Sequence, residues 1–205
     1  NQALQTLEKY KLRLDQVLSN LSALEFEDLV TLADVLMVIQ RSEMVERIAK
    51  EVRFYISELG IEGRLIRMQL DELMGSVVED SLLVIKDYCA KKARAENVKK
   101  QLADLSSDDL LELAVIGRVL GYEEAGETIV DLPIHPHGYR LLKKIPRLPI
   151  TVVDKIVDKF SDLQHVLHAS IEALDDVDGV GTVRAKAIQD GLKRLKEYNL
   201  LERYI

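Results

Sequence analysis

The placement of proline constrains the fold of this chain more than any other sequence feature. All 4 prolines lie between Pro133 and Pro149, so proline interrupts no helix in the first 132 residues. Apolar residues recur there every three or four positions, which is the period of a helix with one buried face. We expect helices to follow these apolar stripes over residues 7–21, 26–59, 78–100 and 107–120. The pattern therefore predicts an all-α fold.

Glycine and serine mark the expected ends of these helices. Gly60 and Gly63 punctuate the second stripe, and Gly75 is expected to stop a short helix that follows it. Ser106, followed by acidic residues, is typical of a helix N-cap, and Gly121 is expected to end that helix. The Gly/Pro/His-containing stretch after it has no period.

This aperiodic stretch predicts the domain boundaries. We expect a helical bundle or linker domain over residues 1–121, a connecting loop over residues 122–138 and a C-terminal module over residues 139–205. With 47% hydrophobic residues among 205, the chain can bury a sizeable core. Because the bundle already begins as helix at Asn1, without Met, we expect the chain to be a piece of a longer protein.

Cysteine and charge narrow the setting and the partners. Cys89 is the one cysteine, so no internal disulfide can form, and a reducing, cytoplasmic setting is expected. No apolar run approaches the roughly 20 residues of a membrane span. Net charge is −7, but its distribution is uneven: residues 1–140 hold 17 basic and 25 acidic residues (−8), and residues 141–205 hold 11 and 10 (+1). The second part is compatible with a local basic face.

Residues 174–188 carry the strongest functional signal. They follow the pattern h-x-x-h-x-G-h-G-x-x-x-A-x-x-h, where h is apolar, which is typical of two helices joined by a tight turn. Gly179 and Gly181 permit unusual backbone angles and let a phosphate approach the backbone. The N–H groups of the turn and of the following helix then point at that anion. We expect Val180 to fill the turn and Ala185 to let the helices pack closely.

Side chains at the start of the second helix extend the expected phosphate contact. They are Thr182, Arg184 and Lys186, with Lys193 and Arg194 as weaker candidates further along. Such a turn binds phosphate rather than base edges, so it predicts sequence-independent DNA binding. The structural alternative is an ordinary glycine-capped turn between two helices.

An internal repeat favours the DNA-binding interpretation. A shift of 32 residues aligns 145–160 with 177–192, and apolar residues match at 145/177, 148/180, 156/188 and 160/192. Residues 161–170 are expected to form a connecting helix, so the pattern predicts a tandem helix–hairpin–helix domain. The first hairpin has Arg147 and Pro149 in place of the two glycines. Because Pro149 has no N–H, we expect this hairpin to be mainly structural, with Arg147 still touching phosphate.

Several of these segments resemble a known family. Ile-Pro-Arg-Leu-Pro at 145–149, Phe-Ser-Asp-Leu-Gln at 160–164 and the run 178–188 resemble the C-terminus of bacterial DNA integrity scanning proteins, which are diadenylate cyclases. Residues 21–35 and 62–66 resemble the helical linker of that family. The resemblance covers essentially the whole chain, and it implies structure-selective binding of branched or damaged DNA at the nucleoid.

The resemblance also implies what this chain lacks. In that family a cyclase domain, which would precede Asn1, condenses two ATP molecules into cyclic di-AMP with Mg²⁺ or Mn²⁺, and its signatures Asp-Gly-Ala and Arg-His-Arg do not occur here. We therefore expect no catalytic residue and no cofactor in this chain, with ATP and the metal used by the parent protein. The parent is expected to form a homo-oligomer through the missing domain.

Other hypotheses remain open on the sequence alone. The chain could be the DNA-targeting tail of a repair nuclease or ligase, or a helical scaffold that binds proteins and no DNA. His135 and His137 form a conceivable metal pair, but no Cys or Asp/Glu cluster at ligand spacing accompanies them, so a linker loop is the preferred interpretation. Cys89 has no evident activating partner and is expected in the core or on a helix surface.

Overall fold

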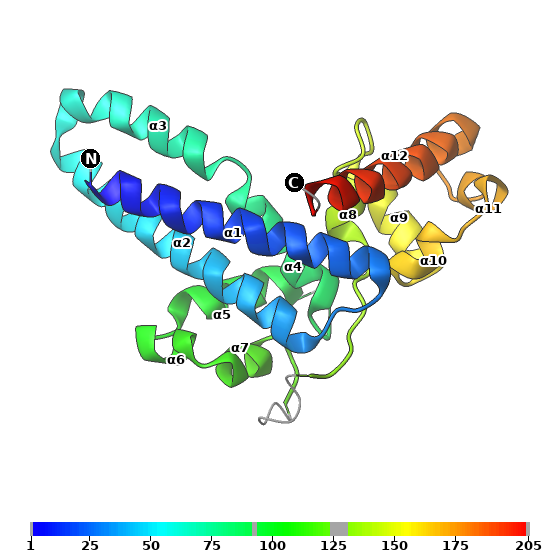
Figure 1. Cartoon of the computed structure of the whole chain (residues 1–205), viewed down its shortest axis with the longest axis horizontal. Helices are drawn as coiled ribbons and strands as arrows, with labels where there is room; N and C mark the ends of the chain where they lie inside the picture. The colour runs from blue at the N-terminus through cyan, green and yellow to red at the C-terminus, as the bar shows by residue number, and fades with distance from the viewer. Residues whose placement is uncertain (1, 92–93, 124–130, 204–205) are drawn as a thin grey trace.

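A computed structural model describes residues 2–91, 94–123 and 131–203 (Figure 1). Within these ranges the regular elements are helices, and the only β-type pairing is an isolated bridge between Thr31 and Pro133. The predicted all-α class is confirmed. None of the helices in the described ranges has both the length and the apolar character that crossing a membrane requires.

The first part of the chain is a bundle built on two long helices, α1 and α2, which lie side by side along most of their length (Figure 1). Shorter helices pack around this pair, with α3 on one side of it and α5, α6 and α7 on the other (Figure 1). The elements are α1 (Gln2–Glu27), α2 (Leu32–Glu58), the 3-10 helix η1 (Gly60–Gly63), α3 (Arg64–Met74), α4 (Val77–Tyr88), α5 (Ala95–Asp104), α6 (Ser107–Leu111) and α7 (Leu113–Val119).

The predicted boundary between the first two helices is wrong. The apolar stripe predicts that the second helix begins near Phe26, but Phe26 lies in the last turn of α1. The chain turns at Asp28, whose φ is 57°, and α2 starts after Thr31. There the Asp34 carboxylate accepts the backbone N–H of Thr31 at 2.9 Å and its hydroxyl at 2.8 Å. This local capping starts a new helix although the apolar period continues across the turn.

Two other expected helices are each broken in two. The stripe over 78–100 is interrupted after Tyr88, because Cys89 is extended (ψ 144°) and the Ala90 N–H donates to the Leu120 carbonyl at 3.0 Å. The helix expected over 107–120 is interrupted at Glu112, where ψ is 109°. Tertiary hydrogen bonding and local backbone turns thus override a continuous apolar period.

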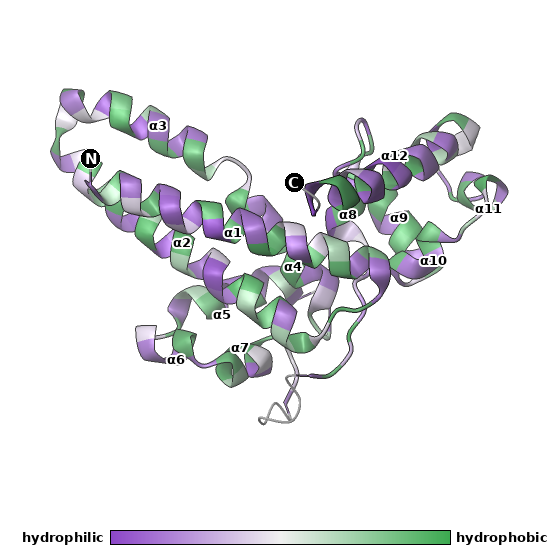
Figure 2. Ribbon diagram, viewed as in Figure 1, coloured by the Kyte–Doolittle hydropathy of each residue, from purple (hydrophilic) through white to green (hydrophobic). Residues whose placement is uncertain are grey.

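The predicted helix ends at Gly75 and Ser106 are confirmed. Gly75 follows the last residue of α3 with φ 43°, and its N–H donates to the Asp71 carbonyl. Ser106 caps α6, where its hydroxyl accepts the Asp109 N–H at 3.1 Å. Figure 2 shows polar and apolar residues alternating along α1 and α2, as expected of helices that bury one face.

The second part of the chain consists of two helix pairs with a short helix between them. The elements are α8 (Tyr139–Lys143), α9 (Ile150–Phe160), α10 (Leu163–Leu167), α11 (Ile171–Asp175) and α12 (Gly181–Glu202). Their apolar cluster also includes Phe26 of α1 and Leu83 of α4, so the module packs directly onto the bundle. The last helix, α12, runs back toward α1, where Ser19 donates to the Glu202 carboxylate at 2.8 Å (Figure 1).

Candidate nucleic-acid interface

The turn between α11 and α12 contains the Gly-Val-Gly pattern that the sequence singled out. Gly179 and Gly181 adopt φ values of 85° and 67°, in the left-handed region that favours glycine. Val180 between them has φ −82° and only 4% of its surface exposed. The expected roles are therefore found: two glycines shape the turn, and Val180 packs inward between the helices.

The space around the two glycines differs. A Cβ atom built on Gly179 would lie 3.4 Å from Cγ2 of Val152 in α9, so the inner side of the turn packs against the first helix pair. A Cβ on Gly181 would meet no heavy atom within 4 Å. The backbone at Gly181 is thus open to an incoming ligand on the side where α12 begins.

The predicted side chains surround this opening. Thr182, Arg184 and Lys186 are all exposed on the first two turns of α12. The Arg184 guanidinium donates from Nη1 to the Gly179 carbonyl at 2.6 Å, which holds the charge over the turn. The weaker candidates Lys193 and Arg194 are also exposed, but they lie further along α12. The arrangement places a cation and open backbone N–H groups at one helix start.

The turn between α8 and α9 repeats this geometry only in part. Arg147 has φ 60°, the same left-handed conformation as Gly179, which stands 32 positions later. Pro149, which corresponds to Gly181, instead has φ −65° and ψ 148° as the N-cap of α9. Arg147 is exposed. The two turns therefore share their first half and differ where the second helix begins.

The two copies of the 32-residue sequence repeat also bury side chains at matching positions. Five pairs of positions related by the 32-residue shift are buried in both copies, with exposures of 6% or less, whereas at the predicted pair 160/192 Leu192 is buried and Phe160 only partly so. The five pairs are Leu142/Leu174, Ile145/Val177, Leu148/Val180, Val153/Ala185 and Ile156/Ile188. The sequence alignment thus identified equivalent core positions, and the two turns lie at equivalent places of one shared core.

Sequence reasoning missed contacts that cross between the two helix pairs. Lys155 of α9 pairs with Asp178 in the second turn at 2.5 Å, and Lys159 donates to the Ala173 carbonyl of α11 at 2.9 Å. The hydrogen bond and charge of Lys155 lower the pKa of Asp178. The positions 155 and 159 share one face of α9, but nothing local in the sequence indicates that this face meets the second turn.

A buried polar cluster, which the sequence also did not reveal, joins the module to the bundle. The Asp87 carboxylate of α4 accepts the backbone N–H groups of Gly138, Tyr139 and Arg140 at 3.0, 2.7 and 3.2 Å, and so caps α8. From Nη2, Arg140 donates to Glu25 and to Ser22 of α1, at 2.9 Å in each case. We call this group, Ser22, Glu25, Asp87 and Arg140, the polar joint.

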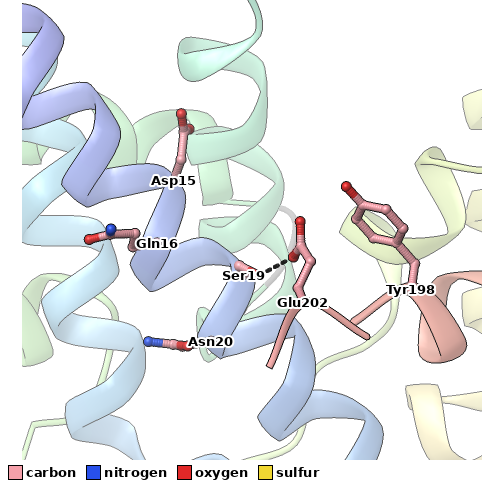
Figure 3. Close-up of a pocket in the computed structure, with 6 residues that line it drawn as sticks. All are labelled: Asp15, Gln16, Ser19, Asn20, Tyr198 and Glu202. Atoms are coloured by element: carbon pink, nitrogen blue, oxygen red, sulfur yellow. Dashed lines mark hydrogen bonds between the residues drawn. The ribbon is translucent and has the colours of Figure 1, made fainter. Parts of the chain in front are cut away.

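A second feature of this junction is a cleft between α1 and α12 (Figure 3). It is about 750 Å³ in volume and is lined by Asp15, Gln16, Ser19, Asn20, Tyr198 and Glu202. Its charged side chains, Asp15 and Glu202, are both acidic. These two carboxylates disfavour the binding of a phosphate in this cleft.

The two histidines of the connecting segment have separate partners. His135 contacts the Asp28 carboxylate at 2.7 Å through Nδ1, and His137 contacts the Ser161 carbonyl at 2.8 Å. Within the described ranges, no group of three His, Cys, Asp or Glu side chains is placed to hold a metal ion. Cys89 is buried, and burial raises the pKa of its thiol. Each of these residues has a structural contact.

The fold and the turns define a class of protein: an all-helical bundle that carries two related helical hairpins at its end. Residues 1–129 match the family described as the DisA bacterial checkpoint controller linker region. This chain therefore belongs to the DisA family, and the resemblance of its sequence to that family is confirmed.

Relatives in several bacteria show the same similarity over nearly the whole chain. The DNA integrity scanning protein DisA of Clostridium botulinum (strain 657 / Type Ba4) is 52% identical over 203 residues, which is 99% of this chain and 57% of the relative. The protein of the same name from Parafrankia sp. is 53% identical over 208 residues, covering 100% and 58%. That of Clostridium kluyveri is 51% identical, covering 98% and 56%. The chain thus spans little more than half the length of these relatives.

Proposed function

We propose that this chain is the DNA-contacting part of a DNA integrity scanning protein and that it grips the phosphate backbone with the turn at Gly179–Gly181. The observation that carries the proposal is the open, left-handed backbone at Gly181, with no atom within 4 Å of an added Cβ, beside the Arg184 guanidinium. Backbone N–H groups at a helix start bind anions, and a nearby arginine adds charge.

The same geometry supports sequence-independent binding. The side chains proposed to contact DNA are Thr182, Arg184 and Lys186, with Arg147 from the other turn; Gly179, Val180 and Gly181 contribute backbone. Contacts of this kind fix the position of a protein on DNA but do not read bases. Selectivity for branched or damaged DNA would then come from shape. With a module charge of +1, from 11 basic and 10 acidic residues, binding should be modest and only weakly salt-dependent.

The proposal extends to the longer protein. Synthesis of cyclic di-AMP from ATP with Mg²⁺ or Mn²⁺, and the assembly of a homo-oligomer, would reside in the part that this chain does not contain. Membership of the DisA family favours this interpretation over a nuclease or ligase tail. The purified chain should then bind DNA but make no cyclic di-AMP, and turnover by the chain alone would contradict this division.

A pair of matched glycine substitutions tests the DNA contact. Gly181→Asp puts a carboxylate where phosphate should bind, while Gly60→Asp introduces the same change at a second exposed glycine with φ 60° and no atom within 4 Å, far along the bundle. Both variants place an aspartate at a similar positive φ, 67° and 60°, and add the same charge. We expect Gly181→Asp to lower affinity for a four-way DNA junction at least tenfold by fluorescence anisotropy, and Gly60→Asp to leave it within twofold.

The controls separate a DNA contact from a structural turn. Circular dichroism should show near wild-type helicity for both variants, and a linear duplex of the same sequence measures shape preference. If folded Gly181→Asp binds DNA as well as Gly60→Asp does, the turn is only structural. The helical scaffold hypothesis would then account better for the chain.

A further inference from the structure

A cationic cavity lies in the bundle, between the loop after α4, one face of α5 and the end of α7. It has a volume of about 280 Å³, and its lining includes Lys91, Arg94 and Arg118. Glu123 is the one acidic side chain among the described residues that line it. This described lining therefore has a net positive charge, although residues 1–140 as a whole carry −8 from 17 basic and 25 acidic residues.

The three cations are not neutralised by the structure around them. Among the residues that the structure describes, Lys91, Arg94 and Arg118 make no ion pair. In contrast, Lys99 of α5 pairs with Glu46, and Arg47 of α2 pairs with Glu43 at 3.0 Å. Three like charges around one cavity repel one another unless an anion is present, so their gathering there favours an anionic ligand.

The cavity is also lined by neutral hydrogen-bond donors, which lie beside the cations. Asn97 and Gln101 are four residues apart on α5 and so share one helix face, and both line the cavity together with Arg94, the N-cap residue of α5. The two amides can donate N–H groups to an oxygen anion. No aromatic side chain is among the described residues that line the cavity, so this lining favours a phosphate over a stacked base.

The floor of the cavity is fixed by backbone contacts. The Ala90 N–H donates to the Leu120 carbonyl at 3.0 Å, and the Cys89 thiol donates to the Lys91 carbonyl at 3.1 Å. Gly121, with φ 101°, allows the two segments to meet, because a Cβ atom there would lie 2.8 Å from Cβ of Ala90. The cations therefore project from a preformed surface.

We infer that this cavity is a second anion-binding site, specific for the phosphate groups of a phosphodiester or of a small phosphate-bearing molecule. It is separate from the turn at Gly181 and does not rest on the function proposed for that turn. Charge-assisted hydrogen bonds from Arg94 and Arg118 would supply most of the affinity, and the amides of α5 would orient the bound oxygens.

Inorganic pyrophosphate is a direct probe for this site. Titrated into the ¹⁵N-labelled chain, it should shift the backbone amides of Ala90 and Gly121 in a saturable manner. The double variant Arg94→Gln/Arg118→Gln should weaken this binding at least tenfold. The matched control, Arg64→Gln/Arg67→Gln, removes two exposed arginines from α3 and should leave binding within twofold. The absence of saturable shifts, or equal weakening in both variants, would overturn the inference.

DNA distinguishes the two sources of phosphate. If the ligand is a nucleic-acid backbone, the Arg94/Arg118 variant should also lose DNA affinity, and its salt slope should fall by about two. If DNA affinity stays within twofold while pyrophosphate binding is lost, the ligand is a small phosphate-bearing molecule. Gly181→Asp should leave the pyrophosphate-induced shifts of the Ala90 and Gly121 amides unchanged in either case, because these amides report on the cavity and not on the turn, so failure of this inference and failure of the proposed DNA contact are separable.

Discussion

Arg147 and Gly179 adopt the same left-handed backbone conformation at equivalent positions of the two turns, with φ values of 60° and 85°. For a residue with a Cβ this conformation costs roughly 1–2 kcal/mol. Because the exposed Arg147 side chain has no burial to offset that cost, we infer that it is kept for what its guanidinium contacts. The first turn would then supply through a side chain the phosphate contact that is proposed for the backbone N–H groups at Gly181.

The first prediction separates these two kinds of contact. Arg147→Ala keeps the backbone strain but removes the charge, so DNA affinity should fall less than in Gly181→Asp, and the salt slope should fall by about one. Pro149→Gly should change affinity little, since Pro149 offers no N–H to lose. Anisotropy titrations at several salt concentrations measure both quantities. An unchanged slope in Arg147→Ala would exclude a phosphate contact by this arginine.

The second prediction concerns the charge of the second turn. Asp178 is 88% exposed and holds Lys155 at 2.5 Å. Asp178→Asn removes a negative charge beside the proposed phosphate site and frees Lys155, so DNA affinity should rise about two- to fivefold at low salt, an effect of the size expected for an exposed charge. Asp104→Asn, the same change at an exposed position of α5, serves as the control. A gain of equal size in both variants would indicate only the altered net charge.

The third prediction tests the polar joint. Arg140 and Glu25 are almost fully buried, with side-chain exposures of 3% and 0%. Arg140→Met leaves Glu25 and Asp87 without a cation, so the free energy of unfolding should fall by about 3–5 kcal/mol. Adding Glu25→Gln should recover part of the loss, because it removes one unpaired charge. Urea denaturation measures all three proteins.

An exposed ion pair at the same junction provides the comparison. Arg203 and Glu27 pair at 2.7 Å with 39% of each side chain exposed. Arg203→Ala should cost about 1 kcal/mol or less. If Arg140→Met costs no more than Arg203→Ala, the polar joint does not hold the module on the bundle.

The fourth prediction concerns pH. Burial, and then the nearby charge of Glu25, raise the pKa of Asp87 from 3.8 to about 7. Between these values the folded protein retains a proton that the unfolded chain has released. The contribution of Asp87 to stability therefore falls as pH rises from about 4 to about 7, and it is constant above that range. Wild type should lose stability relative to Asp87→Asn between about pH 4 and about pH 7, and parallel pH profiles would contradict this.

Local sequence predicted the turns but not their surroundings. The Gly-Val-Gly pattern at 179–181 and the 32-residue repeat predicted the left-handed turn and the equivalent core positions, because both depend on residues close in sequence. The polar joint escaped prediction because Glu25 and Asp87 lie 115 and 53 positions before Arg140. Buried charges so far apart in the chain leave no periodic signal.

Helix boundaries failed for a related reason. At Cys89 the apolar period continues, yet the chain leaves the helix because Ala90 bonds to Leu120. Periodicity reports which residues are buried, and it does so equally well when two helices share one stripe. The apolar period therefore does not reveal a turn that depends on a distant hydrogen-bond acceptor. A turn that needs glycine, as at Gly75, can be predicted from the residue itself.

The length of α12 fixes how the proposed phosphate site at its start is rotated relative to the contact with α1 at its end. Its 22 residues span about 33 Å, with the proposed phosphate site at its first residue and Glu202, the partner of Ser19 in α1, at its last. As one continuous helix, α12 thus connects the proposed phosphate site rigidly to the bundle. Inserting one residue at its centre would turn one end by about 100° relative to the other. The turn at Gly181 and the Glu202 contact with α1 could then no longer be oriented correctly at the same time, although the sequence at each end of the helix would be unchanged.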